Sequence, residues 1–250
     1  MSRSSLLFFV TSFVSVSISF AQYDICGNFT LPLQPTKKNV LIIGDSISMS
    51  IPYTPGGYGL NVQQLLDPKG INVEHGGGFF SGGQASNTAK GLNCTNTSFY
   101  GNYLNFTGGT QFDVITFNYG LHDLVNCNDT SECSEHVDPA VYSQNILTIY
   151  NRLVPFAKNV IFVTTTPVPN VTTSLGRTYD AAIVYNHEAL KALQGTKAVI
   201  CDLWTNVIKY CGAYYTSCDL QIPENVHFLP KGQAFLGNLV ANSILSVINT

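Results

Sequence analysis

Short apolar runs recur along the chain, and segments with helical spacing lie between them. The run at 39–44 is apolar and ends in glycine, as expected for a strand that is covered on both faces. Four further runs share this short length and apolar character: 71–74, 112–118, 159–165 and 198–203. Together the five runs predict the strands of one sheet.

Helical patterns follow the later strands. Asp138 and Pro139 form a cap followed by a proline at the first helical position. Behind them, apolar residues recur at helical spacing over 142–153, and the same spacing over 236–247 predicts a closing helix.

A further helix is expected between the fourth and fifth strands, with Asp180 as its cap. Its inward-facing residues are then Ile183, Leu190 and Leu193. Residues 76–110 are rich in glycine, asparagine and threonine, so this region is interpreted as a long loop with one helix starting near Ser86.

Strands that alternate with helices predict an α/β domain with a parallel sheet. We expect a three-layer α/β/α fold with a mainly parallel, five-stranded sheet. The sequence shows neither an internal repeat nor a linker to a second domain. In such sheets the chemistry collects at the carboxyl ends of the strands.

The first 21 residues have the features of a secretory signal peptide. Arg3 provides the positive start, 6–14 is a short apolar run, and 19–21 has the small-x-small cleavage pattern. An uncleaved anchor is the alternative, but the run is short and rich in serine for a bilayer span. We therefore expect a secreted protein, with a single domain over 22–250.

Charge and composition exclude some partners. Only 11% of the residues are charged, the formal net charge is −3, and the lysines do not cluster. This pattern does not favour nucleic acid binding. The apolar segment at 239–248 is broken by polar residues, so no stable membrane anchor is expected there.

Two further features agree with export. The mature chain has six N-x-Ser/Thr sequons, which predict a glycosylated surface; they are at Asn28, Asn93, Asn96, Asn105, Asn128 and Asn170. Among the seven cysteines, Cys127–Cys133 and Cys211–Cys218 are close enough in sequence to close local loops, and Cys26–Cys94 is a weaker possibility. Cys201 is then the unpaired, buried thiol. No cysteines and histidines have zinc spacing, so no metal site is expected.

A serine follows the first strand directly, in the sequence Gly44-Asp45-Ser46-Ile47-Ser48. A hydroxyl at a strand end projects into the crevice, but serine is a weak nucleophile without a neighbouring base. The alternative role of Ser46 is that of a turn residue. We interpret Asp45 and Asp123 as turn and loop supports.

The candidate base is His227, which lies just before the closing helix. Glu224 is three residues upstream, and this spacing can bring its carboxylate against the imidazole within one tight loop. The other histidines have plainer surroundings in the sequence.

Four segments in this order resemble the conserved blocks of the SGNH, or GDSL-like, hydrolases. Gly44–Ser48 resembles block I, 82–85 block II, Tyr119–Asp123 block III and Glu224–His227 the final block. The resemblance spans about 38–248. It implies a flavodoxin-like sheet and ester hydrolysis through an acyl-serine, without a cofactor.

The resemblance also implies residue roles. Ser46 would be the nucleophile, His227 the general base and Glu224 the residue that orients His227. The oxyanion would be bound by the backbone N–H groups of Ser46 and Gly83 and by the side chain of His122.

Two positions depart from the family pattern. Glu224 stands where aspartate is usual, which is a mild change. His122 stands where the family has asparagine, and a neutral histidine donates one N–H only in the correct tautomer. The other interpretation of His122 is structural, and it would leave the oxyanion site one donor short.

The expected function is therefore a secreted serine esterase for an acyl ester, with O-acetyl and other short acyl groups favoured. One alternative is a catalytically weak or inactive protein that binds a glycan or lipid. Another is a lysophospholipase- or thioesterase-like lipid hydrolase. The partner expected in each case is a small-molecule, glycan or lipid ester. A nucleotide-binding protein is disfavoured, because neither a Walker lysine nor a Gly-x-Gly-x-x-Gly loop is present.

Overall fold

The computed structural model describes residues 33–34, 36–49, 57–75, 87–96, 111–126, 135–171 and 176–249. Its centre is a five-stranded sheet with the order β2-β1-β3-β4-β5, in which every neighbouring pair is parallel. The strands are β1 (Lys38–Gly44), β2 (Ile71–His75), β3 (Phe112–Asn118), β4 (Ala157–Val163) and β5 (Val199–Cys201). This is the flavodoxin-like order, and the predicted fold class is confirmed.

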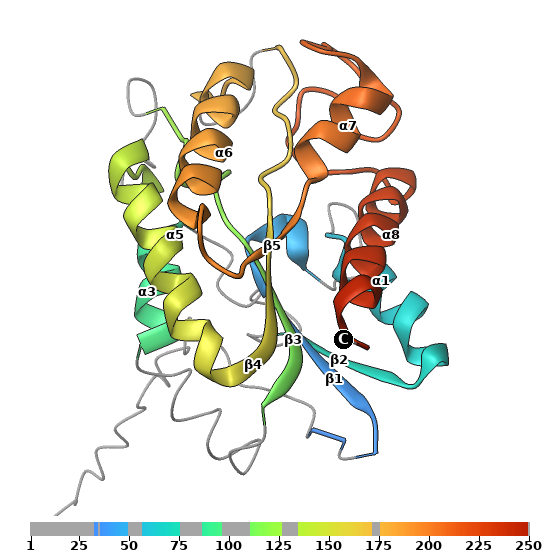
Figure 1. The fold of residues 1–250 in the computed structure, drawn as a ribbon. Coiled ribbons are helices and arrows are strands. Elements are labelled where there is room, and N and C mark those ends of the chain that lie inside the picture. The colour runs from blue at the N-terminus through green and yellow to red at the C-terminus, as the bar shows by residue number, and fades with distance from the viewer. Residues whose placement is uncertain are drawn as a thin grey trace, which may run out of the picture.

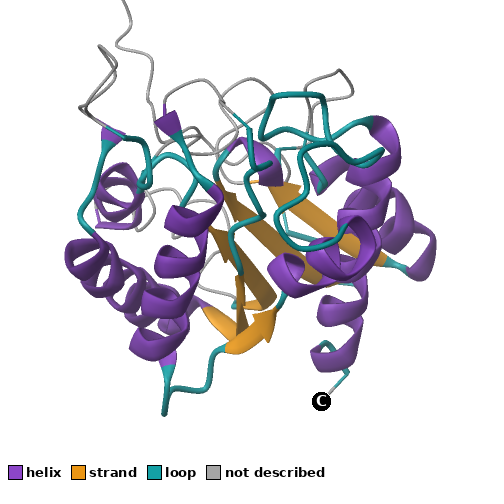
Figure 2. Ribbon diagram, turned by 90° about the horizontal axis from the view of Figure 1, so that it is seen from above, coloured by secondary structure: helices purple, strands orange, loops and turns teal. Residues whose placement is uncertain are grey.

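Helices cover both faces of the sheet (Figure 1; Figure 2). On one face lie α3 (Thr88–Asn96), α5 (Pro139–Leu153) and α6 (Tyr179–Leu193). On the other face α1 (Gly59–Leu66) packs against α8 (Pro230–Val247), with α7 (Leu203–Cys211) on the same side. Short 3-10 turns are η1 (Ser46–Ser48), η2 (Asp67–Lys69) and η4 (Val154–Phe156).

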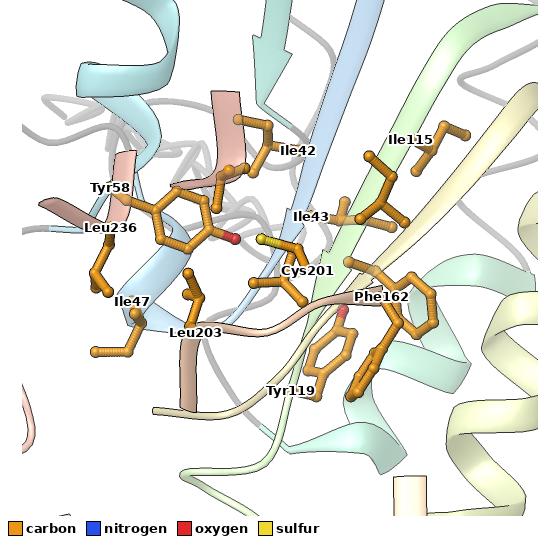
Figure 3. Packing of buried hydrophobic residues seen from close by; sticks show 14 of the residues in the cluster. Ile42, Ile43, Ile47, Tyr58, Ile115, Tyr119, Phe162, Cys201, Leu203 and Leu236 are labelled. Atoms are coloured by element: carbon orange, nitrogen blue, oxygen red, sulfur yellow. The ribbon is translucent and has the colours of Figure 1, made fainter. Parts of the chain in front are cut away.

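The core lies on both faces of the central strands. Every residue of β3 is buried, and in β1 only Lys38 is exposed. Figure 3 shows part of this core, in which the Tyr58 hydroxyl points toward the thiol of Cys201. Strands buried on both faces read as continuous apolar runs, which is why the sequence reveals them clearly.

The helices differ from the sequence prediction in two respects. The side chain of Thr178, not of Asp180, caps α6 by accepting a hydrogen bond from the Ala181 N–H. Ile183 and Leu190 are each 40% exposed, so the prediction that they face inward is wrong, whereas Leu193 is buried as expected. The helix has apolar residues on two sides, and its buried side is the one with the small alanines that let α5 approach.

Helix α1 and helix α7 were missed by the sequence analysis. Helix α7 begins at Leu203, inside the run that was assigned to the fifth strand, so β5 is shorter than expected. The helix expected near Ser86 is α3. Asp138 is the N-cap residue of α5, but its side chain makes no capping hydrogen bond.

The cysteine predictions have mixed outcomes. Cys211–Cys218 forms a disulfide, and Cys201 is free and buried, as expected. Cys94 is disulfide-bonded, but Cys26, Cys127 and Cys133 lie outside the described residues, so these pairings stay predictions. Within the described ranges no helix is long and apolar enough to cross a membrane, and no group of side chains suits a metal ion.

Candidate active site

The nucleophile turn, residues 44–48, continues directly from β1. Gly44 has φ +153°, and a Cβ there would lie 2.4 Å from the carbonyl oxygen of Asn118, so only glycine fits. The Asp45 N–H donates to the same carbonyl, 3.0 Å away. The Asp45 carboxylate accepts from the Ile47 N–H at 2.9 Å, which confirms its role as a turn support. These contacts aim Ser46 at the carboxyl edge of the sheet.

The histidine loop, residues 221–229, is a hairpin-like segment before α8. Its ends pair through a bridge between Gln221 and Phe228. The buried side chain of Gln221 donates to the carbonyls of Pro167 and Val226 at 3.0 and 3.2 Å, and it accepts from the Tyr215 hydroxyl. One glutamine therefore ties this loop to the segment after β4.

Ser46 and His227 meet between these two segments. Ser46 Oγ lies 2.9 Å from His227 Nε2, and His227 Nδ1 lies 2.9 Å from Asn225 Oδ1. The same Asn225 oxygen accepts from the His227 backbone N–H at 3.0 Å. An amide oxygen is only an acceptor, so the proton of the neutral imidazole is placed on Nδ1. The lone pair of Nε2 then faces the serine, as a general base requires.

Glu224 does not occupy the position expected of it. Its side chain is exposed, and the structure has neither a hydrogen bond nor an ion pair between it and His227. The prediction that Glu224 contacts the imidazole is wrong, and Asn225 makes that contact instead. The reason is local: Glu224 has φ +54°, and the turn at this residue is followed directly by Asn225, whose side chain folds back onto the ring.

Arg177 brings a buried positive charge to the site. It precedes α6, and its Nε–H donates to the carbonyl of Leu121 at 2.5 Å. Burial lowers the pKa of His227, and the Arg177 guanidinium lowers it further. His227 therefore stays neutral, and able to accept a proton, to a lower pH than an ordinary histidine.

His122 lies on the segment after β3, within electrostatic range of His227. Burial, helped by Arg177, lowers the pKa of His122 to about 4. Its Nδ1 is 3.7 Å from a carboxylate oxygen of Glu135, but His122 is neutral near pH 7, so this contact is no ion pair there. The carboxylate favours the tautomer with the proton on Nδ1, and donation to an oxyanion from Nε2 would need the other tautomer.

The expected oxyanion donors differ in how far the structure describes them. Ser46 is the first residue of the η1 turn. The N–H of a first residue has no acceptor within its own helical turn, so the Ser46 N–H is left for another partner. Among the described residues no hydrogen bond uses this N–H. Gly83 lies outside the described residues, so its role stays a prediction.

Two buried carboxyl groups lie under the site. Asp123 accepts from both the N–H and the hydroxyl of Thr88, and so holds the start of α3, in agreement with its predicted supporting role. Burial raises the pKa of Asp45 and that of Asp123 to about 7 each. Each group also has one carboxylate oxygen without a hydrogen bond.

The geometry thus combines a serine hydrogen-bonded to a base with one free backbone N–H donor, at the point where the strand order reverses, between β1 and β3. The family model for the GDSL-like lipases and acylhydrolases matches residues 40–240. The chain belongs to this family. It is accordingly a serine hydrolase that acts on ester bonds.

Solved structures of similar fold include other acylhydrolases. The lipase/acylhydrolase from Enterococcus faecalis superposes with a TM-score of 0.62 at 15% identity, over 84% of this chain and 96% of that one. A catalytic mutant of Axe2, an acetylxylan esterase from Geobacillus stearothermophilus, gives a TM-score of 0.61 at 15% identity, over 84% and 94%. At these identities the likeness concerns the fold. A search of curated proteins found no match.

Sequence reasoning on this acylhydrolase missed Asn225 and Arg177. Asn225 lies inside the final block, so a search for any acceptor within two or three residues of His227 would have included it. Arg177 has no sequence signal, because the segment after β4 reaches the site only through tertiary packing.

Proposed function

We propose that this protein is a secreted serine esterase that hydrolyses an acyl ester through an acyl-serine intermediate, with O-acetyl and other short acyl groups as its substrate class. The observation that carries the proposal is the linked pair of 2.9 Å contacts from Ser46 to His227 and from His227 to Asn225. Family membership supports ester chemistry. The names of structural neighbours that act on acetylated xylan agree with a short acyl group.

In the first half-reaction the Ser46 oxygen attacks the ester carbonyl carbon while His227 Nε2 takes the hydroxyl proton. The carbonyl oxygen becomes an oxyanion, with the Ser46 N–H as a donor. When the C–O bond to the alcohol breaks, His227 returns the proton to the leaving oxygen, and the acyl group remains on Ser46. Water repeats the sequence in the second half-reaction and releases the acid.

Asn225 is a positioning residue in this scheme. It holds the Nδ1–H tautomer and the ring orientation, but its neutral amide stabilises the imidazolium less than a carboxylate would. The lowered pKa of His227 agrees with this. Much of the stabilisation must then come from the oxyanion donors, each worth about 3–4 kcal/mol in comparable sites.

The test is labelling with a fluorophosphonate probe, which reports an activated serine without knowledge of the natural ester. Wild type should label, and Ser46→Ala and His227→Ala should not. Circular dichroism and thermal unfolding would show that the variants are folded. Absence of labelling in folded wild type would contradict the proposal and favour a protein that binds an ester without hydrolysing it.

A preference for p-nitrophenyl esters of long acyl chains over p-nitrophenyl acetate would contradict the substrate class while leaving the mechanism intact. That outcome would favour the lipid hydrolase alternative.

A further inference from the structure

The segment after β3, residues 119–123, runs next to the nucleophile turn. Asn118, the last residue of β3, accepts a hydrogen bond from the Asp45 N–H at 3.0 Å. Burial raises the pKa of the Asp45 carboxyl group, and the nearby Leu121 N–H is one of the groups that oppose this rise. A group that fixes this segment therefore also fixes where His122 stands relative to the nucleophile turn.

The carbonyl groups of the segment are held from outside at both ends and in the middle. At the ends, the Tyr119 carbonyl accepts from the Tyr142 hydroxyl at 2.9 Å, and the Asp123 carbonyl accepts from a backbone N–H just before α5 at 3.0 Å. In the middle, the Leu121 carbonyl accepts from Arg177 Nε at 2.5 Å. Among the residues that the structure describes, no other group donates to this buried carbonyl.

Arg177 reaches the segment from a firmly held part of the chain. It is 6% exposed. Before it, Gly176 has φ +61°, and a Cβ there would lie 2.9 Å from the Cβ of Asn126. After it, Thr178 caps α6 with its side chain. Both neighbours of Arg177 are therefore fixed, and the guanidinium is held against the segment that follows β3.

The bond from Arg177 sets the orientation of the peptide that joins Leu121 to His122. The C=O and N–H of a trans peptide lie in one plane and point in opposite directions, so a fixed carbonyl fixes the whole unit. His122 follows directly, with its Nδ1 3.7 Å from a carboxylate oxygen of Glu135. If the Leu121 carbonyl lost its partner, this peptide could rotate and would carry the imidazole of His122 with it.

We infer that Arg177 is a positioning residue for ester hydrolysis: by holding the Leu121 carbonyl, it fixes the 119–123 segment and His122 against the nucleophile turn. This inference rests on the proposed function, because it takes the segment as the oxyanion side of the site. In this role Arg177 needs no contact with the substrate. The contact that matters is the one between its Nε and Leu121.

The charge of Arg177 acts on the site as well, and substitutions separate it from the contact. Burial lowers the pKa of His227 and of His122, and the guanidinium lowers both further. Glutamine has an amide N–H at the position of the arginine Nε but no charge. Lysine keeps the charge but has a methylene at that position, and methionine has neither the donor nor the charge.

Steady-state kinetics of the three variants with p-nitrophenyl acetate tests the contact. Arg177→Lys and Arg177→Met should lower kcat about 10- to 100-fold and change KM less than about threefold, because a displaced oxyanion side affects the transition state more than binding. Arg177→Gln should keep kcat within about fivefold of wild type. A kcat that follows the charge, near wild type in Arg177→Lys and low in Arg177→Gln, would overturn the inference.

The acid limb of kcat/KM reports the charge independently. Without the charge the pKa of His227 rises, so the limb should move to higher pH in Arg177→Gln and Arg177→Met. In Arg177→Lys the limb should stay in place although kcat falls. A fall in kcat in Arg177→Lys together with a shift as large as that in Arg177→Met would assign the loss to the charge and overturn the inference.

Arg152→Met is the matched control for a general loss of stability. Arg152 Nη1 also donates to a leucine carbonyl, that of Leu92, at 2.7 Å. Arg152 lies in the last turn of α5, just before β4 begins, and so at the amino edge of the sheet, opposite the site. Arg152→Met should lower the thermal unfolding temperature but leave kcat and the pH profile unchanged. A loss of kcat equal to that in Arg177→Met would overturn the inference.

A measurement without turnover separates this inference from the proposed function. In Ser46→Ala protein at pH 7, the imidazole NMR signals of His122, assigned with His122→Asn, should shift on adding Arg177→Lys and stay on adding Arg152→Met. Unshifted signals would overturn the positioning role even if wild type reacts with the fluorophosphonate probe. Shifted signals without labelling of wild type would overturn the esterase proposal and leave the position of His122 dependent on Arg177.

Discussion

Ser46 and His227 meet at 2.9 Å, but the nucleophile turn and the histidine loop are held by different kinds of interaction. The nucleophile turn continues a buried strand, and its hydrogen bonds come from backbone groups or from the neighbouring Asp45. The histidine loop has backbone bonds of its own, such as Ile222 N–H to the His227 carbonyl at 3.0 Å, but side chains join it to its surroundings and to the base. Gln221 ties the loop to the segment after β4, and Asn225 orients the ring. A turn built on a strand depends mainly on local sequence, whereas a loop held by side chains depends on partners far along the chain.

The largest effect is expected where one side chain alone orients the base. Asn225→Ala should lower kcat/KM about 100-fold or more, because the imidazole loses its tautomer and its orientation. Glu224→Gln should change kcat/KM less than about twofold, since Glu224 is exposed and does not contact His227. Steady-state kinetics with p-nitrophenyl acetate measures both, and a larger loss with Glu224→Gln would restore the role expected from the sequence.

Asn225→Asp tests the same contact through the pH dependence of kcat/KM. A carboxylate at Nδ1 stabilises the imidazolium and raises the pKa of His227, which in wild type is lowered by burial and Arg177. The acid limb of kcat/KM should therefore move to higher pH in Asn225→Asp, with activity lost first on the acid side. An unmoved acid limb would show that another group controls this limb.

Gln221→Ala should have the next largest effect. It leaves the carbonyls of Pro167 and Val226 and the Tyr215 hydroxyl without this partner in a buried place. We expect a loss of about 2–4 kcal/mol in the free energy of unfolding and a fall of about tenfold in kcat/KM through displacement of His227. Urea unfolding and kinetics test this. Gln233→Ala, which removes a single bond to the Phe228 carbonyl, is the milder comparison.

The nucleophile turn should respond to pH through stability. The pKa of Asp45 is raised by burial to about 7, against about 3.9 in an unfolded chain. Between these values the folded state holds the proton and the unfolded state does not, so stability falls as pH rises, by up to about 1.4 kcal/mol per pH unit. The same sign holds for Asp123.

Asp45→Asn and Asp123→Asn should therefore gain stability relative to wild type as the pH is raised from about 4 to 8. Chemical denaturation at several pH values measures the difference. A difference that does not change with pH would mean that these carboxyl groups titrate normally in the folded protein.

The smallest effect is expected at His122. His122→Asn replaces a donor that depends on its tautomer with an amide that always donates. The activity of His122→Asn should stay within about threefold of that of wild type, or rise. Adding Glu135→Gln should change the activity of His122→Asn less than it changes the activity of wild type, because the Glu135 carboxylate influences the tautomer of His122 and asparagine has none. Loss of activity in His122→Asn, with none in His122→Ala, would contradict an oxyanion role.

The strands, the sheet class and the positions of Ser46 and His227 followed from the sequence. Strand β1 is a continuous apolar run, and the catalytic serine comes two residues after its end. The position of helix α6 was predicted correctly, but the wrong face was predicted to be buried, because Ile183 and Leu190 form a second apolar stripe that faces solvent. Periodicity identifies a stripe, but the neighbour that covers it is decided by packing.

The sequence by itself determined the five strands, the helices α3, α5, α6 and α8, the serine at the end of β1 and the histidine before α8, because backbone hydrogen bonding and burial act on local patterns. Only the tertiary structure decided that Asn225 takes the place expected of Glu224, and that the buried Arg177 is close enough to His227 to lower the pKa of its imidazole. The physical reason is that each of these contacts depends on where packing or backbone angles place a side chain. A side chain in a turn chooses its partner within a few ångströms, and the backbone angles of one residue, here the positive φ of Glu224, are enough to exchange one partner for the next.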